Sequence, residues 1–286
     1  MTLFTMLQRT LEILRMSIMQ PSVKLSEVRG KMLNVVEEET LFGVKFNALT
    51  MDGLMESIDS DLSKNRSITL AFSNPEFIIE AQRNGFLRDY LNRVNYNLAD
   101  GIGVVAASRL LGKGLPERVT GTDFVYRMAE FCAHHSHSLF LFGGRPGVAA
   151  AAKGELEKAY PGIKIVGTVD GYINDLDKVV EEVNRVKPTF LMVCLGNPIQ
   201  EQWISAHRDL LEAKVVFGNG GALDFCSGRV KRAPRWMQRL ALEWLYRLRT
   251  DFSVKRIRRQ ARLSSYVWWV FQQFVKRQLS GQRSGS

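Results

Sequence analysis

The chain has 286 residues, of which 45% are apolar and 24% charged, with a formal net charge of +10 at pH 7. This composition is typical of a soluble globular protein with one large core. It excludes a membrane-spanning segment, because the longest apolar run near the basic end, residues 266–271, is far shorter than the roughly 20 residues that a bilayer requires. From Arg229 onward, fifteen Lys or Arg face two acids, so this segment carries +13 and residues 1–228 carry −3.

The N-terminal residues 1–40 read as an extension outside the core. Apolar residues recur there at helical spacing, and Arg9, Glu12 and Arg15 interrupt them, which indicates an amphipathic helix rather than a signal peptide. We expect three parts in all: this extension, a core at 41–228 and a basic C-terminal appendage at 229–286.

Between the two ends, apolar runs alternate with segments of helical period. Continuous apolar strands separated by amphipathic helices predict an α/β, Rossmann-like, doubly wound and mainly parallel sheet covered on both faces. The predicted strands are residues 67–73, 94–100, 138–144, 163–169, 189–196 and 214–221.

Each predicted strand is followed by a cluster of Gly, Asn, Pro, Asp or Gln. Such residues make ordinary turns and helix caps, so any one cluster has a purely structural explanation. Ligands of parallel sheets, however, bind at the carboxyl ends of the strands. A series of polar clusters at successive strand ends therefore favours one shared pocket.

Two of these clusters carry recognisable chemistry. Asp100 closes an apolar strand and precedes Gly-Ile-Gly, where it either caps the next helix or acts as a general base. Gly143 and Gly144 open a strand-to-helix turn whose backbone N–H groups are expected to face an anion. Neither stretch completes the GxGxxG fingerprint of dinucleotide-binding folds, so each glycine signal alone is weak.

No metal or cofactor site is predicted. The pairs Asp59/Asp61 and Asp175/Asp177 have Asp-x-Asp spacing, but neither follows an apolar strand, and we expect solvated helix caps. The histidines at 134, 135, 137 and 207 form no ligand pattern. Three widely spaced cysteines without a CxxC pair indicate a reduced cytosolic compartment.

The C-terminal appendage interleaves Arg and Lys with aromatic and aliphatic residues at helical spacing. This pattern is typical of a helix lying on anionic lipid. A nucleic-acid arm, a core-packing helix with solvated arginines and a tail folded over the active site are the alternatives. A lipid surface combined with an active-site lid is the interpretation we favour.

Seven motifs give the chain a family resemblance. In order and spacing it resembles the glycosyltransferase family named after WecG, TagA and CpsF (glycosyltransferase family 26), from about Leu41 to about Arg262. The motifs are "FSNPEFIIEAQRN", "LADGIGVV", "PERVTGTDF", "LFLFGGRPGV", "GTVDGYI", "VCLGNPIQEQWI" and "GNGGALDFCSGRVKRAPRWMQRLALEWLYRL".

The resemblance implies an inverting, metal-independent hexosyltransferase of bacterial cell-surface polysaccharide synthesis. It implies a nucleotide-diphosphate donor, expected to be UDP-linked, a polyprenyl-diphosphate-linked saccharide as acceptor, and peripheral attachment to the cytoplasmic face of the inner membrane. Asp100 matches the family's proposed general base. The implied donor-binding residues are Asn74, Arg118, Gly143, Gly144 and Gln200, and the residues implied for the acceptor diphosphate or the lid are Arg232, Arg239 and Arg247.

Two other functions compete with this one. A nucleotide-dependent oxidoreductase shares the fold class, but the incomplete GxGxxG argues against it. A nucleic-acid-binding protein would use the +13 appendage, and we expect no nucleic-acid partner. The sequence leaves open which sugar is transferred, to which saccharide, and whether the protein is a homo-oligomer.

Overall fold

The computed structural model describes residues 36–173, 175–176, 178–234, 237–238, 243, 246 and 254–283, with side chains of the last range at 263–279. The predicted N-terminal amphipathic helix and the predicted site residues Arg239 and Arg247 lie outside the described residues. The division of the chain at residues 40 and 228 stays a prediction.

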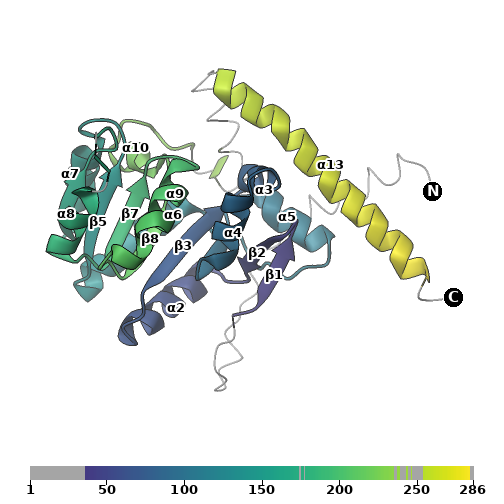
Figure 1. The fold of residues 1–286 in the computed structure, drawn as a ribbon, viewed down its shortest axis with the longest axis horizontal. Helices are drawn as coiled ribbons and strands as arrows, with labels where there is room; N and C mark the ends of the chain where they lie inside the picture. The colour runs from purple at the N-terminus through teal and green to yellow at the C-terminus, as the bar shows by residue number, and fades with distance from the viewer. Residues whose placement is uncertain are drawn as a thin grey trace.

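A six-stranded sheet with the order β4-β3-β8-β7-β5-β6 runs through the centre of the protein, and all of its neighbouring strands are parallel (Figure 1). Strands β3 and β7 are buried along their whole length, as expected for a sheet covered on both faces. The predicted α/β class and all six predicted strands are confirmed. The strands are β3 Ile68–Ser73, β4 Tyr96–Ala99, β5 Ser138–Gly143, β6 Lys164–Val169, β7 Phe190–Cys194 and β8 Val215–Gly218.

The sheet divides the apolar core into two clusters, and helices cover each of its faces. Alternate residues of each strand supply the two clusters, because successive side chains of a strand point to opposite faces. One face carries α3 Pro75–Ala81, α4 Gly85–Arg93, α5 Ile102–Leu110, α8 Lys178–Val186 and α9 Ile199–His207, which is followed by the 3-10 turn η1 Arg208–Leu210. The other carries α2 Met51–Ser63, α6 Gly121–His135, α7 Val148–Ala159 and α10 Ala222–Cys226.

A short antiparallel hairpin, β1 Glu38–Leu41 and β2 Val44–Asn47, lies beside the edge strand β4 and was not predicted. Side-chain amides join the two. Asn97 of β4 donates its backbone N–H to Asn47 Oδ1 at 2.7 Å and its side-chain amide to the Lys45 carbonyl at 2.7 Å, while its own Oδ1 accepts from Ser73 at 2.6 Å. The hairpin thus covers a strand edge that would otherwise be open.

The C-terminal helix α13, Val254–Arg283, packs across α3 and adds one face to the core (Figure 1). Tyr266 is 4% exposed, its ring lies 5.7 Å from that of Phe42, and its hydroxyl donates to the Gly103 carbonyl at 3.2 Å. The opposite face leaves apolar side chains in solvent, with Val267 66% and Trp268 55% exposed. In the described part of the chain, α13 included, no helix combines the length and apolar character that crossing a bilayer requires.

Replacing Tyr266 by Ala is expected to release α13 from the core. Removing a buried aromatic ring costs about 3 kcal/mol, so hydrogen exchange of α13 backbone amides should accelerate on the order of a hundredfold. Trp268→Ala removes a ring of the same helix that faces solvent and should leave exchange unchanged. Equal acceleration in both variants would show that α13 is not held through Tyr266.

Candidate functional site

The predicted core site residues gather at one edge of the sheet, because every parallel strand ends there. Asp100 follows β4, Asn74 follows β3, Gln200 opens α9 after β7, and the Gly143–Gly144 turn ends β5. Arg118 reaches the same edge through the loop before α6, where the next residue, Val119, donates its N–H to the Ala99 carbonyl at 3.0 Å. The order of strands therefore places the predicted base at one end of the edge and the glycine turn toward the other.

Asp100 is half-buried between the starts of two helices. Its N–H donates to the Ser73 carbonyl at 3.0 Å, which continues the β3–β4 pairing, and its Oδ2 accepts the Gly121 N–H at 3.4 Å. Gly121 is the first residue of α6, so the positive end of that helix dipole faces the carboxylate. Gly101 follows with φ of 131°, a conformation that favours glycine, and brings the chain against Asn74 and Pro75.

Asn74 caps α3, with its Oδ1 accepting the Phe77 N–H at 3.1 Å. The oxygen of the Asn74 amide is therefore used to cap α3. The amide nitrogen is the part of the side chain that can donate a hydrogen bond to a ligand. Its role in binding a donor stays a prediction.

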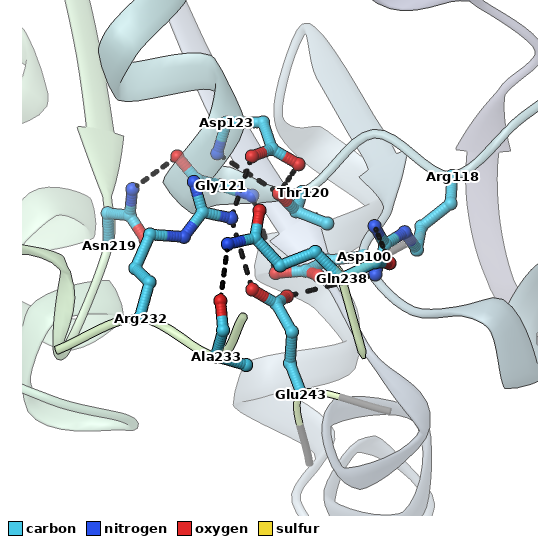
Figure 2. Close-up of polar contacts among 10 residues, drawn as sticks. All are labelled: Asp100, Arg118, Thr120, Gly121, Asp123, Asn219, Arg232, Ala233, Gln238 and Glu243. Atoms are coloured by element: carbon cyan, nitrogen blue, oxygen red, sulfur yellow. Dashed lines mark hydrogen bonds and ion pairs between the residues drawn. The ribbon is translucent and has the colours of Figure 1, made fainter. Parts of the chain in front are cut away.

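A network of two arginines and two acids joins the basic appendage to the core (Figure 2). Arg232 Nη2 lies 2.8 Å from Asp123 Oδ1 and 3.1 Å from Glu243 Oε1, and its guanidinium lies 5.6 Å from the Tyr126 ring centre. Arg118 Nη1 lies 3.8 Å from Glu243 Oε2, and its Nη2 donates to the Gln238 carbonyl at 3.4 Å. Glu243 thus bridges the two arginines that were predicted to meet phosphate.

Asp123 anchors this network in the first turn of α6. Burial opposes its ionisation, but hydrogen bonds from Thr120 and Arg232, together with the charges of Arg232 and Arg118, hold the pKa of Asp123 below its ordinary value. Thr120 Oγ1 also accepts the Asp123 N–H at 3.0 Å, the usual N-cap arrangement. The carboxylate is therefore charged over the whole neutral range and holds Arg232 at the start of α6, the helix whose first N–H bonds to Asp100.

The Gly143–Gly144 turn bonds to the end of the neighbouring strand β7 and packs closely against it. The Gly144 N–H donates to the Cys194 carbonyl at 3.0 Å, and a side chain on Gly143 would overlap the Cys194 backbone. The N–H expected to face an anion is thus used within the fold at Gly144. Contact of this turn with a nucleotide diphosphate stays a prediction, and the absence of side chains leaves its backbone approachable.

Sequence reasoning missed several residues that shape the site. Asn219, after β8, donates its amide to the Gly121 carbonyl at 2.7 Å and so ties the start of α6 to the middle of the sheet. The "GNGG" cluster after a strand was its only signal. The only signal for Asp123 was the Thr-x-x-Asp spacing in "TGTD", in which Thr120 caps α6 and Asp123 lies in its first turn. Glu243 gave no signal, because a single acid in a basic stretch looks like a solvated charge.

For the two Asp-x-Asp pairs, the prediction of solvated helix caps is wrong at one position. Asp61 is 7% exposed, accepts from the Tyr96 hydroxyl at 2.7 Å and pairs with Arg66 at 3.3 Å, so the prediction of a solvated cap is wrong there. Its place at the end of α2 packed against β4 explains the burial. Asp175 is half-exposed and pairs with Lys178, and Asp177 lies outside the described residues. Over the described ranges, no three His, Cys, Asp or Glu side chains are arranged to hold a metal ion.

Comparison with known proteins places the chain in a family. The sequence model of the Glycosyl transferase WecG/TagA/CpsF family matches residues 39–280. The chain belongs to this family. As a WecG/TagA/CpsF protein it is a glycosyltransferase, which decides against the oxidoreductase considered from the sequence.

Relatives with an assigned activity are similar over most of the chain. A Bacillus subtilis (strain 168) protein is 33% identical over 214 residues, covering 74% of this chain and 84% of its own length. A Staphylococcus aureus (strain MRSA252) protein is 32% identical over 233 residues, covering 80% of this chain and 91% of its own. Both relatives are named N-acetylglucosaminyldiphosphoundecaprenol N-acetyl-beta-D-mannosaminyltransferase.

Asp123→Asn is expected to weaken the link between appendage and core. The variant loses the ion pair with Arg232, so urea denaturation at neutral pH should show a loss of about 1 kcal/mol, allowing for the partial exposure of this carboxylate. Because its pKa is lowered in the fold, Asp123 stabilises the protein above its ordinary pKa of 3.8, and this contribution is lost as the pH falls through the lowered value.

The matched control is Asp52→Asn, which breaks an exposed ion pair with Arg127 and should stay within about 0.5 kcal/mol of the parent protein. A wild-type free energy of unfolding for Asp123→Asn at neutral pH would contradict the anchoring role.

Proposed function

We propose that this glycosyltransferase moves a hexose-type sugar from a UDP-linked donor, with inversion, to a saccharide carried on polyprenyl diphosphate. The activity for which the relatives are named, transfer of N-acetylmannosamine to N-acetylglucosaminyl-diphosphoundecaprenol, supports an N-acetylhexosamine donor and this acceptor. The observation that carries the proposal is the position of Asp100 at the carboxyl edge of the sheet, where it accepts the N–H of Gly121, two residues before the Asp123 that pairs with Arg232 (Figure 2).

In the proposed reaction, Asp100 receives the proton of the attacking acceptor hydroxyl. The hydroxyl oxygen attacks the anomeric carbon from the face opposite the nucleotide diphosphate, whose bond to that carbon breaks as the new one forms. A positioned carboxylate contributes roughly 10²- to 10⁴-fold in rate. The dipole of α6 at Asp100 favours the charged form that accepts a proton.

Arginines are proposed to neutralise the departing diphosphate. Guanidinium groups bind phosphate oxygens through paired hydrogen bonds, and Arg118 and Arg232 converge on one carboxylate, Glu243. We infer that a diphosphate replaces Glu243 between them. Arg239 and Arg247 remain proposed partners of the acceptor diphosphate.

The outer face of α13 is proposed to rest on the anionic cytoplasmic surface of the membrane. Its apolar side chains Val267, Trp268 and Leu279 are more than half exposed, and Phe271 stacks on Trp268 at 5.8 Å. A helix with one apolar face on the core and another in solvent suits a lipid-linked acceptor, because it brings the active site to the lipid.

Asp100→Asn should reduce sugar transfer at least about a hundredfold while leaving donor binding within a few-fold. The amide keeps the shape of the side chain but cannot take up the proton. Transfer to a short-chain polyprenyl-diphosphate N-acetylglucosamine, followed by mass spectrometry, measures the loss. Asp170→Asn changes an acid at the far end of the same edge, bonded to Gly147, and should retain activity. Near-normal turnover in Asp100→Asn would remove Asp100 from the role of base.

Trp268→Asp should weaken binding to anionic liposomes at least about tenfold, because it places a charge in the face that meets lipid. Leu210→Asp supplies the matched control, since Leu210 is 62% exposed on η1, outside α13. Flotation with phosphatidylglycerol vesicles measures both variants. Equal losses of liposome affinity in the two variants would show that any added negative charge weakens binding, and would contradict a specific role for α13.

A further inference from the structure

Gln200, in the first turn of α9, carries a buried side-chain oxygen with no hydrogen-bond partner within the described structure. The residue is 3% exposed, its Nε2 donates to Glu201 Oε1 at 2.7 Å, and its Oε1 accepts nothing. Buried polar atoms are nearly always hydrogen-bonded, so an unsatisfied one needs an explanation such as a ligand. Because ligands of parallel sheets bind at the carboxyl edge, we consider a substrate group as that ligand.

The surroundings of Gln200 show where this oxygen points. A side chain on Gly218, the last residue of β8, would meet Gln200 Nε2 at 2.6 Å, so the amide lies flat on a strand end that has no side chain. Oε1 lies near Gly220, which in turn approaches Gly196 in the β7–α9 loop. The oxygen is therefore directed between two glycine-containing loops at the predicted donor pocket.

Glu201 decides which end of the amide faces that pocket. It is 3% exposed and accepts from both Gln200 Nε2 and Asn197 Nδ2, the latter at 3.3 Å. An ionised carboxylate only accepts hydrogen bonds, so the amide N–H must turn toward it and the amide oxygen away.

We propose that Glu201 is a positioning residue that holds the Gln200 amide oxygen toward the donor, where it accepts a hydrogen bond from a hydroxyl or amide N–H of the nucleotide sugar. This rests on the proposed function for the identity of the ligand, while the orientation of the amide rests on Glu201 alone. The subsite selects against a ligand that presents an acceptor, because two facing oxygens leave both unpaired.

The charge state of Glu201 makes the arrangement sensitive to pH. Burial raises the pKa of Glu201 to about 7, against the opposing hydrogen bonds from Gln200, its own N–H and Asn197. From α4, Tyr90 faces this charge and its pKa is raised mainly by burial, so it stays neutral, and Arg208 of η1 lies near Tyr90. Above pH 7 both carboxylate oxygens accept, whereas below it one of them carries a proton and can donate, so the amide is no longer held in a single orientation.

Donor affinity of the full chain tests the proposal. Calorimetric titration with UDP-N-acetylmannosamine and UDP-N-acetylglucosamine should show wild-type affinity falling as the pH drops through about 7. Glu201→Gln should weaken binding roughly three- to tenfold at high pH and remove this pH dependence, because a neutral amide pairs with either end of Gln200. Glu182→Gln, an exposed acid on α8, is the matched control and should behave as the wild type.

A double-mutant cycle separates positioning from general packing. If Glu201 acts through Gln200, adding Glu201→Gln to Gln200→Met should change donor affinity no further. Additive losses would overturn the proposal, as would wild-type affinity and pH dependence in Glu201→Gln.

A measurement without any nucleotide tests the positioning role of Glu201 independently of the proposed function. The side-chain amide NMR signals of Gln200 and Asn197 should shift with a midpoint near pH 7 in the wild type and stay constant in Glu201→Gln. Amide signals that do not titrate in the folded wild type overturn the positioning role whichever nucleotide binds. Titrating amides in a protein that binds neither UDP-sugar would instead overturn the donor subsite and, with it, the proposed function.

Discussion

The parallel arrangement of the six central strands is the constraint on which the rest of the site depends. Parallel strands all end at the same edge, so residues far apart in the sequence meet there without any other device. Asp100, Asn74, Asn219 and Gln200 each follow a different strand, and the starts of α6 and α9 add helix dipoles and backbone donors. The chemistry of the site is therefore assembled from turns, while the buried strands fix the spacing between them.

Two kinds of interaction hold the C-terminal part of the chain to the core. Helix α13 is held by apolar packing around Tyr266, which is insensitive to salt and to the charge state of the site. The segment at Arg232 and Glu243 is held by partly buried ion pairs, which a charged ligand can compete for. The appendage thus combines an attachment that does not depend on charge with one that the proposed diphosphate would compete for.

All six strands of the sheet could be predicted to within three residues at each end, since most are apolar runs bounded by Gly, Asn, Pro or Asp. The hairpin at Glu38–Asn47 could not, because its strands are short, partly charged and stabilised by the Asn97 side chain rather than by an apolar pattern. The burial of Asp61 and the bridging position of Glu243 depend on partners distant in the sequence, Tyr96 and Arg118. Single polar residues acquire such roles from tertiary neighbours, which periodicity does not encode.

The family resemblance supplied Asp100, Arg118 and Gln200 as site residues, and the structure adds the groups that orient them. Glu201 stands next to Gln200 in the sequence and would have passed for an ordinary surface acid of an amphipathic helix. Only its burial and its two amide donors distinguish it. Residues that act through another side chain are in general harder to find from sequence than those that touch the ligand, because their signal is an environment and not a residue type.

The three hydrogen bonds of Asn97 have a consequence for alignment along β4. A shift of one residue between β4 and β3 would turn every side chain of β4 to the opposite face, and Asp100 would leave the rim with them. Asn97 forms hydrogen bonds with Ser73 of β3 on one side and with Lys45 and Asn47 of β2 on the other. A shift of β4 would break all three bonds together. The β1–β2 hairpin, which was not predicted, therefore helps to fix the register of β4 and with it the position of Asp100.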